Sequence, residues 1–169
     1  CLTVDNGNIF AGTDGGGVFR SVNNGGNWSL TGSGISGSVL AVSANGNDML
    51  AGTGGYGMYA SSNGGTNWAP ANTGILINST MFSLLRDGGN VFASSNGGIY
   101  VSSNNGGLWT PVNNGLTSTY VYEVVKTGSN LFAATDGGGV CISGDNGANW
   151  TAFNNGLNGT ALVISMGTD

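Results

Sequence analysis

Short apolar runs alternate with glycine- and asparagine-rich segments along the whole chain. The run 39–42 is followed by Asn45-Gly46, and the run 49–53 is followed by the glycine-rich segment 54–57. An Asn-Gly pair between two apolar runs is a strong signal for a tight hairpin, because both residues tolerate positive φ. No stretch shows sustained helical periodicity. The pattern predicts short antiparallel strands joined by tight turns.

The same succession of runs is repeated four times. A second strand is expected at 9–13, 49–53, 91–95 and 131–135, and a third strand at 18–21, 58–61, 99–102 and 140–143. Four strands in about 41 residues describe one blade of a β-propeller. The predicted fold class is therefore all-β: a propeller-type array of four-stranded antiparallel blades, with small residues packed near the axis at Ala11, Ala51, Ala93 and Ala133.

An eight-residue motif of the form Ser-x-Asn/Asp-x-Gly-x-x-Trp ends the third strand of every repeat, and its tryptophans are 40, 41 and 41 residues apart. Its fixed positions are Ser21, Asn23, Gly25 and Trp28; Ser61, Asn63, Gly65 and Trp68; Ser102, Asn104, Gly106 and Trp109; and Ser143, Asp145, Gly147 and Trp150. The third residue is expected to accept hydrogen bonds from its own turn. The indoles are expected to pack over the hairpin or between blades.

This motif resembles the Asp-box, also called the BNR repeat, and the four copies extend the resemblance over the whole chain. The Asp-box family includes sialidases, some endoglucanases, sortilin-type receptors and many secreted bacterial proteins. The resemblance implies a β-propeller of the bacterial secreted type, with the box at the blade periphery and away from any active site. The boxes are accordingly interpreted as structural turns.

The chain is predicted to be one repeat domain, residues 1–169. We expect blade 1 at 1–34, blade 2 at 35–74, blade 3 at 75–115, blade 4 at 116–156 and an extra strand within 157–169. Three arrangements fit the extra strand: a segment of a longer propeller, an array that pairs with other copies of itself, or a closed four-bladed ring. An open arc would expose its end faces to water, which favours the first two.

Charge excludes several kinds of partner. The chain has three basic and eight acidic residues and a net charge of −5. A nucleic-acid interface needs more cations than this, as does an anionic membrane surface. No apolar run reaches about 18 residues, so no membrane insertion is expected. The predicted partners are other copies, further blades of a longer chain, or a glycan or protein ligand.

Catalytic chemistry has little support in the sequence. There is no histidine, which excludes a Ser-His-Asp triad and the usual zinc sites. Arg20 and Arg86 are the only arginines, too few for the arginine cluster that the resemblance to sialidases would require. Glu123 is the one glutamate that a glycoside hydrolase fragment could use, and Asp14 and Asp136 lie in glycine turns that could hold calcium. Turn and strand roles are favoured for all three, so no catalytic residue, metal or cofactor is predicted.

The remaining candidates concern binding, modification and the cysteines. Stacking surfaces for a carbohydrate or peptide are candidates at Tyr56, Tyr100, Tyr120 and Tyr122, against ordinary strand packing. Glycan acceptors are expected at Asn78 and Asn158, which stand in Asn-x-Ser/Thr sequons between blades. Cys141 is expected to be a buried small hydrophobe, and Cys1 to be processed, internal to a longer protein or lipidated.

Few lysines, many small polar residues and the sequons favour an extracellular or cell-surface location in a bacterium. The function predicted from the sequence is a non-enzymatic structural or interaction scaffold that self-associates or joins a larger surface assembly. The alternatives are a carbohydrate- or peptide-binding propeller and a glycoside hydrolase fragment. Purified protein is expected to run larger than a 17 kDa monomer in light scattering.

Overall fold

The computed structural model describes residues 1–157 and 162–167, and their regular structure consists entirely of strands. Sixteen strands form four separate four-stranded sheets. The innermost strands are β1 (Leu2–Asp5), β5 (Val39–Asn45), β9 (Met81–Asp87) and β13 (Val121–Thr127). The second strands are β2 (Asn8–Gly12), β6 (Asp48–Thr53), β10 (Asn90–Ser95) and β14 (Asn130–Thr135).

The two outer strands of each sheet are shorter. The third strands are β3 (Val18–Ser21), β7 (Gly57–Ser61), β11 (Gly98–Ser102) and β15 (Gly139–Ser143). The outermost strands are β4 (Ser29–Leu30), β8 (Ala69–Pro70), β12 (Thr110–Pro111) and β16 (Thr151–Ala152). Neighbours along the chain pair antiparallel in every sheet, so each sheet is a simple meander. The predicted all-β fold of four four-stranded antiparallel blades is confirmed.

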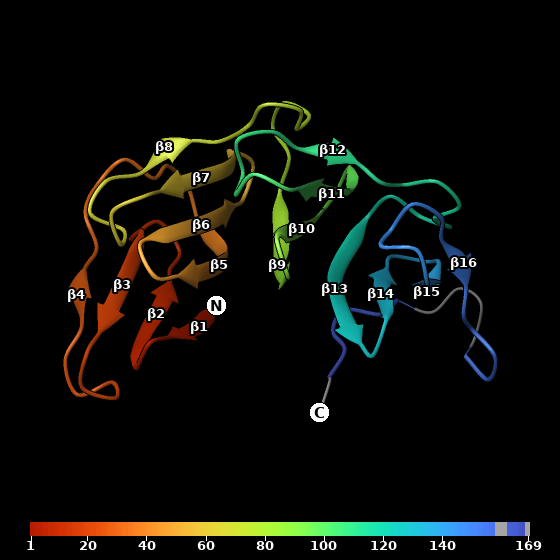
Figure 1. Cartoon of the computed structure of the whole chain (residues 1–169), viewed down its shortest axis with the longest axis horizontal. Helices are drawn as coiled ribbons and strands as arrows, with labels where there is room; N and C mark the ends of the chain where they lie inside the picture. Colours follow the sequence, from red (N-terminus) through yellow and green to blue (C-terminus); the bar gives the residue numbers. More distant parts are fainter. Residues whose placement is uncertain (158–161, 168–169) are drawn as a thin grey trace.

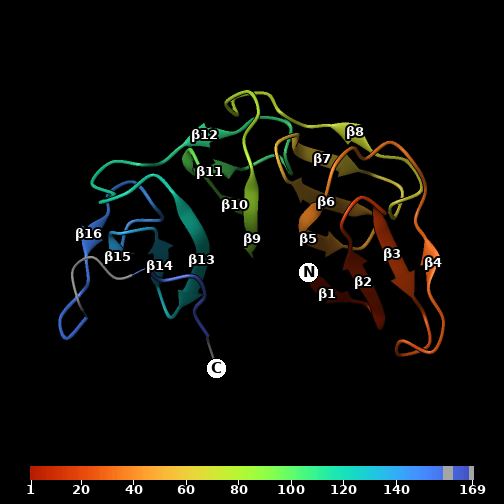
Figure 2. The ribbon, with the colours of Figure 1, turned by 180° about the vertical axis from the view of Figure 1, so that it is seen from behind.

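The four blades stand side by side in an open arch (Figure 1). The innermost strands line the concave side, and the outermost strands lie at the rim. The reverse view shows the same arch, with blade 1 and blade 4 at its two free ends (Figure 2). The leading face of a blade is the one that packs on the blade before it in the chain, and the trailing face is the one that packs on the blade after it.

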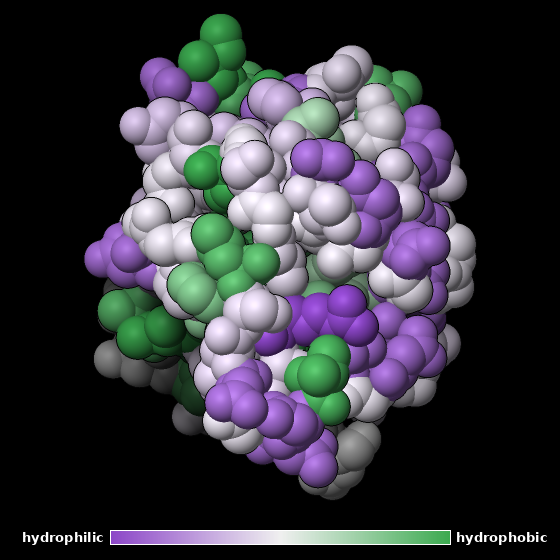
Figure 3. Space-filling view, turned by 90° about the vertical axis from the view of Figure 1, so that its left-hand side faces the viewer, coloured by the Kyte–Doolittle hydropathy of each residue, from purple (hydrophilic) through white to green (hydrophobic). Residues whose placement is uncertain are grey.

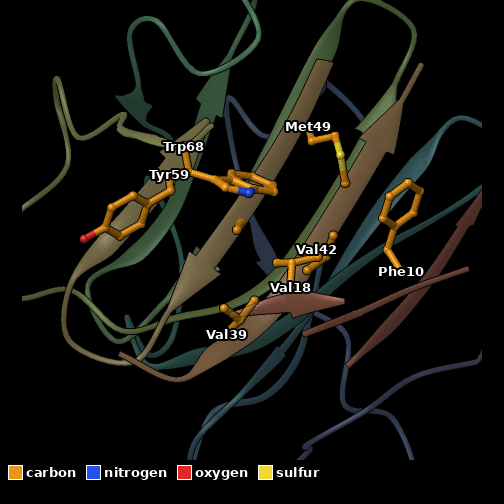
Figure 4. Close-up of a cluster of buried hydrophobic side chains, with 8 residues drawn as sticks. Phe10, Val18, Val39, Val42, Met49, Tyr59 and Trp68 are labelled. Carbon is orange, nitrogen blue, oxygen red and sulfur yellow. The ribbon is translucent and has the colours of Figure 1, made fainter. Parts of the chain in front are cut away.

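The hydrophobic core lies between blades rather than within one. Phe10 and Val18, on the trailing face of blade 1, meet Val42, Met49 and Trp68, on the leading face of blade 2 (Figure 4). Equivalent clusters join blade 2 to blade 3 and blade 3 to blade 4. The small residues predicted near the axis are fully buried in three of these blades, at Ala51, Ala93 and Ala133. Ala11 is only half-buried, because it lies on the leading face of blade 1.

Three of the innermost strands contain one extra residue. Pairing jumps from Val39 to Ala41, from Met81 to Ser83 and from Val121 to Glu123. Leu40, Phe82 and Tyr122 are therefore left out of the ladder at matching positions of blades 2, 3 and 4. A bulge of this kind redirects a side chain and increases the local twist.

The predicted extra strand at the end of the chain does not form in the described residues. Residues 162–167 have no strand structure, and residues 158–161 and 168–169 lie outside the described part. The segment begins where a fifth innermost strand would begin, because Val163 N–H donates to the Thr135 carbonyl at 3.4 Å, as Val39 N–H donates to Thr13 at 2.9 Å. Each innermost strand pairs with the second strand of its own blade, and none of the described strands takes that place for residues 162–167.

None of the described residues forms a helix long and apolar enough to cross a lipid bilayer.

Candidate functional site

The four motifs are built as nearly identical turns, called tryptophan turns below: residues 21–28, 61–68, 102–109 and 143–150. In each, the serine hydroxyl accepts the N–H of the glycine at the fifth position, at 2.8–3.0 Å. The same hydroxyl donates to Oδ1 of the third residue, at 2.8–3.0 Å. That Oδ1 also accepts the N–H of the seventh residue, at 2.8–2.9 Å. Every turn is thus closed by its own side chains.

Asp145 is the one acid at the third position. Its Oδ2 accepts a further hydrogen bond from the Asn149 side-chain amide at 2.8 Å. The bonds from the side chain and backbone of Asn149, followed by the bond from Ser143, hold the pKa of Asp145 below its ordinary value. The carboxylate therefore occupies an amide position without strain at neutral pH.

The tryptophans join each blade to the one before it. The indole Nε1 of Trp68 donates to the Thr31 carbonyl at 3.2 Å, that of Trp109 to Ala71 at 3.0 Å, and that of Trp150 to Val112 at 2.8 Å. The tryptophan backbone N–H makes a second contact, to the carbonyls of Ser33, Thr73 and Asn114, at 3.3, 2.9 and 2.8 Å. A buried indole normally finds a partner for its N–H. These two bonds and the buried ring form the interblade tryptophan contact.

Trp28 has the same turn but no blade before it among the described residues. Its side chain is 42% exposed, compared with 1% for Trp109. No hydrogen bond from its indole or its backbone N–H is formed with any described residue. Blade 1 therefore presents the tryptophan donors of an interblade contact, and none of the described residues provides the acceptors.

A glycine after each outermost strand makes room for the tryptophan of the next blade. Gly74 has φ +92°, and a Cβ there would lie 1.9 Å from the Trp109 carbonyl oxygen. Gly115 has φ +84°, and its Cβ would lie 2.1 Å from the Trp150 carbonyl oxygen. Gly156 keeps the same conformation at φ +86°, with no described atom within 4 Å of the Cβ position. The sequence shows this glycine as a repeated position, but its role appears only from the approach of the neighbouring blade.

Two bulge residues, Phe82 and Tyr122, and Tyr120, which directly precedes β13, bring three aromatic rings together. The ring centroids of Phe82, Tyr120 and Tyr122 lie 5.1–5.3 Å apart, and the rings are tilted against one another. These three residues are called the aromatic cluster. Tyr120 is 38% exposed. Desolvation, followed by the charge of Asp136 and the nearby Tyr120, raises the pKa of Tyr122 above its ordinary value.

The other two tyrosine candidates lie apart from this cluster. Tyr100 is buried in the core between blades 2 and 3, so its interpretation as a stacking surface is wrong. Its strand position faces the blade before it, and the indole of Trp109 shares that core. Tyr56 is exposed on a turn of blade 2, beside Ile77 and Asn78.

The carboxylates are mostly engaged within the fold. Oε2 of Glu123 accepts the backbone N–H of Met166 at 2.6 Å. Asp14 accepts the hydroxyl of Ser38 across the first blade boundary. Asp87 pairs with Lys126 of the next blade at 2.5 Å. Within residues 1–157 and 162–167, no three His, Cys, Asp or Glu side chains gather as metal ligands would.

The arginines have internal partners. Arg86 crosses from blade 3 to blade 2, where Nε donates to the Ser43 hydroxyl at 2.7 Å and Nη2 donates to the Asp48 carbonyl at 3.3 Å. Arg20 donates from Nε and Nη2 to the Asn8 side chain at 3.1 and 2.9 Å. The Arg86 guanidinium therefore joins blade 3 to blade 2, and the Arg20 guanidinium joins β3 to β2 within blade 1.

The sequons and cysteines occupy different surroundings. Asn78 is exposed in the loop that enters blade 3, with φ +62°. Asn158 lies outside the described residues. Both cysteines are free: Cys1 is exposed, and Cys141 is buried in the core between blades 3 and 4, as predicted.

Comparison with known proteins gives matches over most of the chain. A family model described as the DUF6242 beta propeller domain matches residues 41–161. No curated protein matches the sequence. Among solved structures, an ancestral GH74 enzyme is 23% identical with a TM-score of 0.75, covering 90% of this chain and 23% of that one.

Two further solved structures have the same arrangement of blades. The extracellular domain of a putative hybrid two component system from B. thetaiotaomicron is 20% identical with a TM-score of 0.76, covering 94% of this chain and 23% of that one. YCF48 bound to D1 peptide is 16% identical with a TM-score of 0.67, covering 86% of this chain and 51% of that one. At these identities the likeness concerns the fold alone. The chain spans about a quarter to a half of the length of these three structures.

Proposed function

Because the chain belongs to the family of DUF6242 beta propeller domains, we propose that it is a non-enzymatic scaffold whose blades join further blades. The observation that carries this proposal is the interblade tryptophan contact, which is made three times inside the arch and is left open at both of its ends. The two open ends support a module that is built to be extended. The scaffold combines that extension with a concave side that is free for other contacts.

A structural role also agrees with where the acidic side chains lie. Glycoside hydrolysis needs two carboxylates facing each other across a substrate. Glu123 instead accepts a backbone N–H, and Asp145 closes a turn. These contacts within the fold support the non-enzymatic interpretation over a hydrolase.

An extracellular location on a bacterium is part of the proposal. The exposed sequon at Asn78 is compatible with it, and one of the similar structures is named as an extracellular domain. We interpret the four tryptophan turns as Asp-boxes of the secreted type, since each has the Ser, Asn/Asp, Gly and Trp of that motif in its closing role.

The scaffold function is tested by the mass of the purified 169-residue chain in light scattering at micromolar concentration. We expect a species heavier than the 16.8 kDa of one chain, together with no release of reducing sugar from polysaccharides. A chain that stays at single-chain mass, or one whose hydrolytic activity is lost in Glu123→Gln, contradicts the proposal.

A second function, carbohydrate binding, is favoured by the aromatic cluster. Three adjoining rings from two neighbouring blades combine apolar aromatic faces with the phenolic hydroxyls of two tyrosines. Binding sites combine apolar and aromatic lining with a few polar groups in this way. The apolar face of a pyranose ring is the ligand surface that fits it.

We expect Tyr120→Ala to weaken binding of a soluble oligosaccharide by about tenfold or more in calorimetry, the loss typical of truncating an interfacial aromatic residue. Tyr56→Ala is the matched control, because it removes an exposed tyrosine that is not part of the cluster. Equal effects of the two variants, or no binding across a glycan array, exclude this second function.

A further inference from the structure

We propose that the blade 1 end of the chain binds the blade 4 end of a second copy, so that two arches close into one ring of blades. This inference rests on the proposed scaffold function and names its partner and its contact surface.

The leading face of blade 1 is apolar at the positions that are buried in the other blades. Strand register defines these positions: Leu2 pairs with Ala11 as Val42 pairs with Ala51, and Ile9 pairs with Ser21 as Met49 pairs with Ser61. Val42 and Met49 are core residues of the first interface, whereas Leu2 is 70% exposed. Blade 1 thus presents an interface surface that nothing in the described chain covers.

Figure 3 looks at the blade 1 end of the arch. Hydrophobic residues lie there in separate groups between hydrophilic and near-neutral surface. Leu2 in β1 and Trp28, directly before β4, belong to blade 1, and both are exposed.

The trailing face of blade 4 carries the complementary positions. Phe132 pairs with Ile142 as Phe92 pairs with Val101, and Phe92 is buried under blade 4. Phe153 N–H donates to the Val140 carbonyl at 2.8 Å, as Val112 N–H donates to the Ile99 carbonyl at 2.9 Å. Val112 packs against the core between blades 3 and 4, but Phe153 is 57% exposed, and its ring centroid lies 5.9 Å from that of Phe132.

The polar groups of the two faces also match. Val112 and Asn114 provide the carbonyls that accept the indole and the backbone N–H of Trp150. By the same register, Phe153 and Asn155 present their carbonyls at the end of blade 4. Trp28 presents the two matching donors, its indole and backbone N–H groups, in blade 1. The space beside Gly156 is open, whereas the equivalent space beside Gly115 is filled by the carbonyl of Trp150. Donors, acceptors and the glycine therefore fit one another across the two ends.

The shape of the arch favours a second copy of the chain as the partner. Contact between unlike ends is heterologous, and it closes into a ring when the rotation allows. Both free ends of the arch open toward the same side (Figures 1 and 2). Two four-bladed arches facing each other give eight blades, which is within the range of known propellers. Each closed pair contains the contact twice.

The end of the chain must move for this contact to form. Residues 162–167 lie where the innermost strand of a following blade would begin, which is the place that β1 of the second copy takes. The described part of this segment is held by two hydrogen bonds, Val163 N–H to the Thr135 carbonyl and Met166 N–H to Glu123. Two hydrogen bonds hold this segment less strongly than the burial of a whole blade face holds a docked blade, so the docking blade displaces them.

The test is light scattering and sedimentation of the full chain and of three variants. We expect the unaltered 169-residue chain to have twice the 16.8 kDa mass of one chain, and Trp28→Ala and Gly156→Ala to have single-chain mass, with dimer dissociation constants raised at least about tenfold. Val22→Ser is the control, because Val22 is an exposed residue of the same turn and serine stands there in the next two turns. It should leave the dimer intact.

Mixing the two damaged variants gives the decisive result. A pair made of one Trp28→Ala chain and one Gly156→Ala chain retains one intact contact, so the mixture should dimerise more strongly than either variant alone. A symmetric contact between like ends gives no such recovery and overturns the inference. Circular dichroism checks that both variants keep the strand content of the unaltered chain.

The outcomes separate this inference from the scaffold function. An unaltered chain that remains at single-chain mass contradicts both. If Trp28→Ala and Gly156→Ala associate as well as the unaltered chain does, the scaffold function is retained but the head-to-tail contact is overturned.

Discussion

At the scale of single residues, the third position of the tryptophan turn shows what the turn requires. Three turns have Asn and one has Asp145, yet the Oδ1 contacts agree within 0.2 Å. The turn needs an acceptor oxygen at this position rather than a negative charge. The charge of Asp145 adds only its second bond, to Asn149.

Asp145→Asn is expected to leave the stability at neutral pH little changed and to remove part of its pH dependence. The pKa of Asp145 is lowered in the folded chain. Its ionised form therefore contributes stability above the unfolded pKa, about 3.9 for aspartate, and this contribution is lost as the pH falls through the lower folded value. Denaturant unfolding at pH 7 and pH 3 measures the effect. An identical acid dependence of the two proteins counts against it.

The residue types of the turns could be predicted from the sequence, because Ser, Asn and Gly act on their own neighbours in the chain. The aromatic residues could not be predicted in the same way. Both Tyr100 and Tyr120 precede a valine, but Tyr100 is buried between blades and Tyr120 is exposed just before β13. Which of them is exposed depends on the packing of the neighbouring blade, and a single repeat does not contain that information.

At the scale of elements, the glycine after the outermost strand couples one blade to the next. The same residue with the same φ occurs with a neighbour at Gly74 and without one at Gly156. The difference between these two positions isolates the close approach of the tryptophan carbonyl from the cost of the backbone conformation.

Gly74→Ala is expected to destabilise the chain far more than Gly156→Ala. Both variants place a Cβ on a left-handed backbone, which costs about 1–2 kcal/mol. Only at position 74 does the new atom meet a carbonyl oxygen, at 1.9 Å, which forces blades 2 and 3 apart and puts the loss above about 4 kcal/mol. Urea unfolding of the two variants, at a concentration where the chain is a monomer, provides the comparison. Equal losses would show that the neighbouring blade yields.

The strands themselves follow from the sequence, since apolar runs and Asn-Gly turns set their number and order. The bulges at Leu40, Phe82 and Tyr122 do not. A bulge adds one residue to a strand without altering its composition, so alternation alone gives no sign of it. It becomes visible only when both strands of the pair are aligned.

At the scale of the whole molecule, the arch places its hydrophobic cores at the boundaries between blades. Four blades give three complete boundaries and leave two half-boundaries at the ends. The sequence indicates the number of blades by its period. It does not indicate whether the array closes, because that depends on the angle between neighbouring blades, which arises from packing across each boundary.

Removing residues 162–169 is expected to strengthen the association of two chains. The described part of this segment occupies the place of an innermost strand through two hydrogen bonds, so its loss frees the trailing face of blade 4. The dissociation constant should fall by about tenfold, the equivalent of 1.4 kcal/mol. Sedimentation of the shortened and the full chain provides the measurement. Weaker association of the shortened chain would mean that the segment contributes a strand to its partner.

The direction of the interblade tryptophan contact has a consequence for biosynthesis. Each indole donates to carbonyls that were made some 37 residues earlier, as from Trp68 to Thr31. A blade leaving the ribosome therefore meets acceptors that are already in place, and it can dock without waiting for anything translated later. The array can grow from its N-terminus as a nascent chain, one module at a time, with the newest module always the least protected.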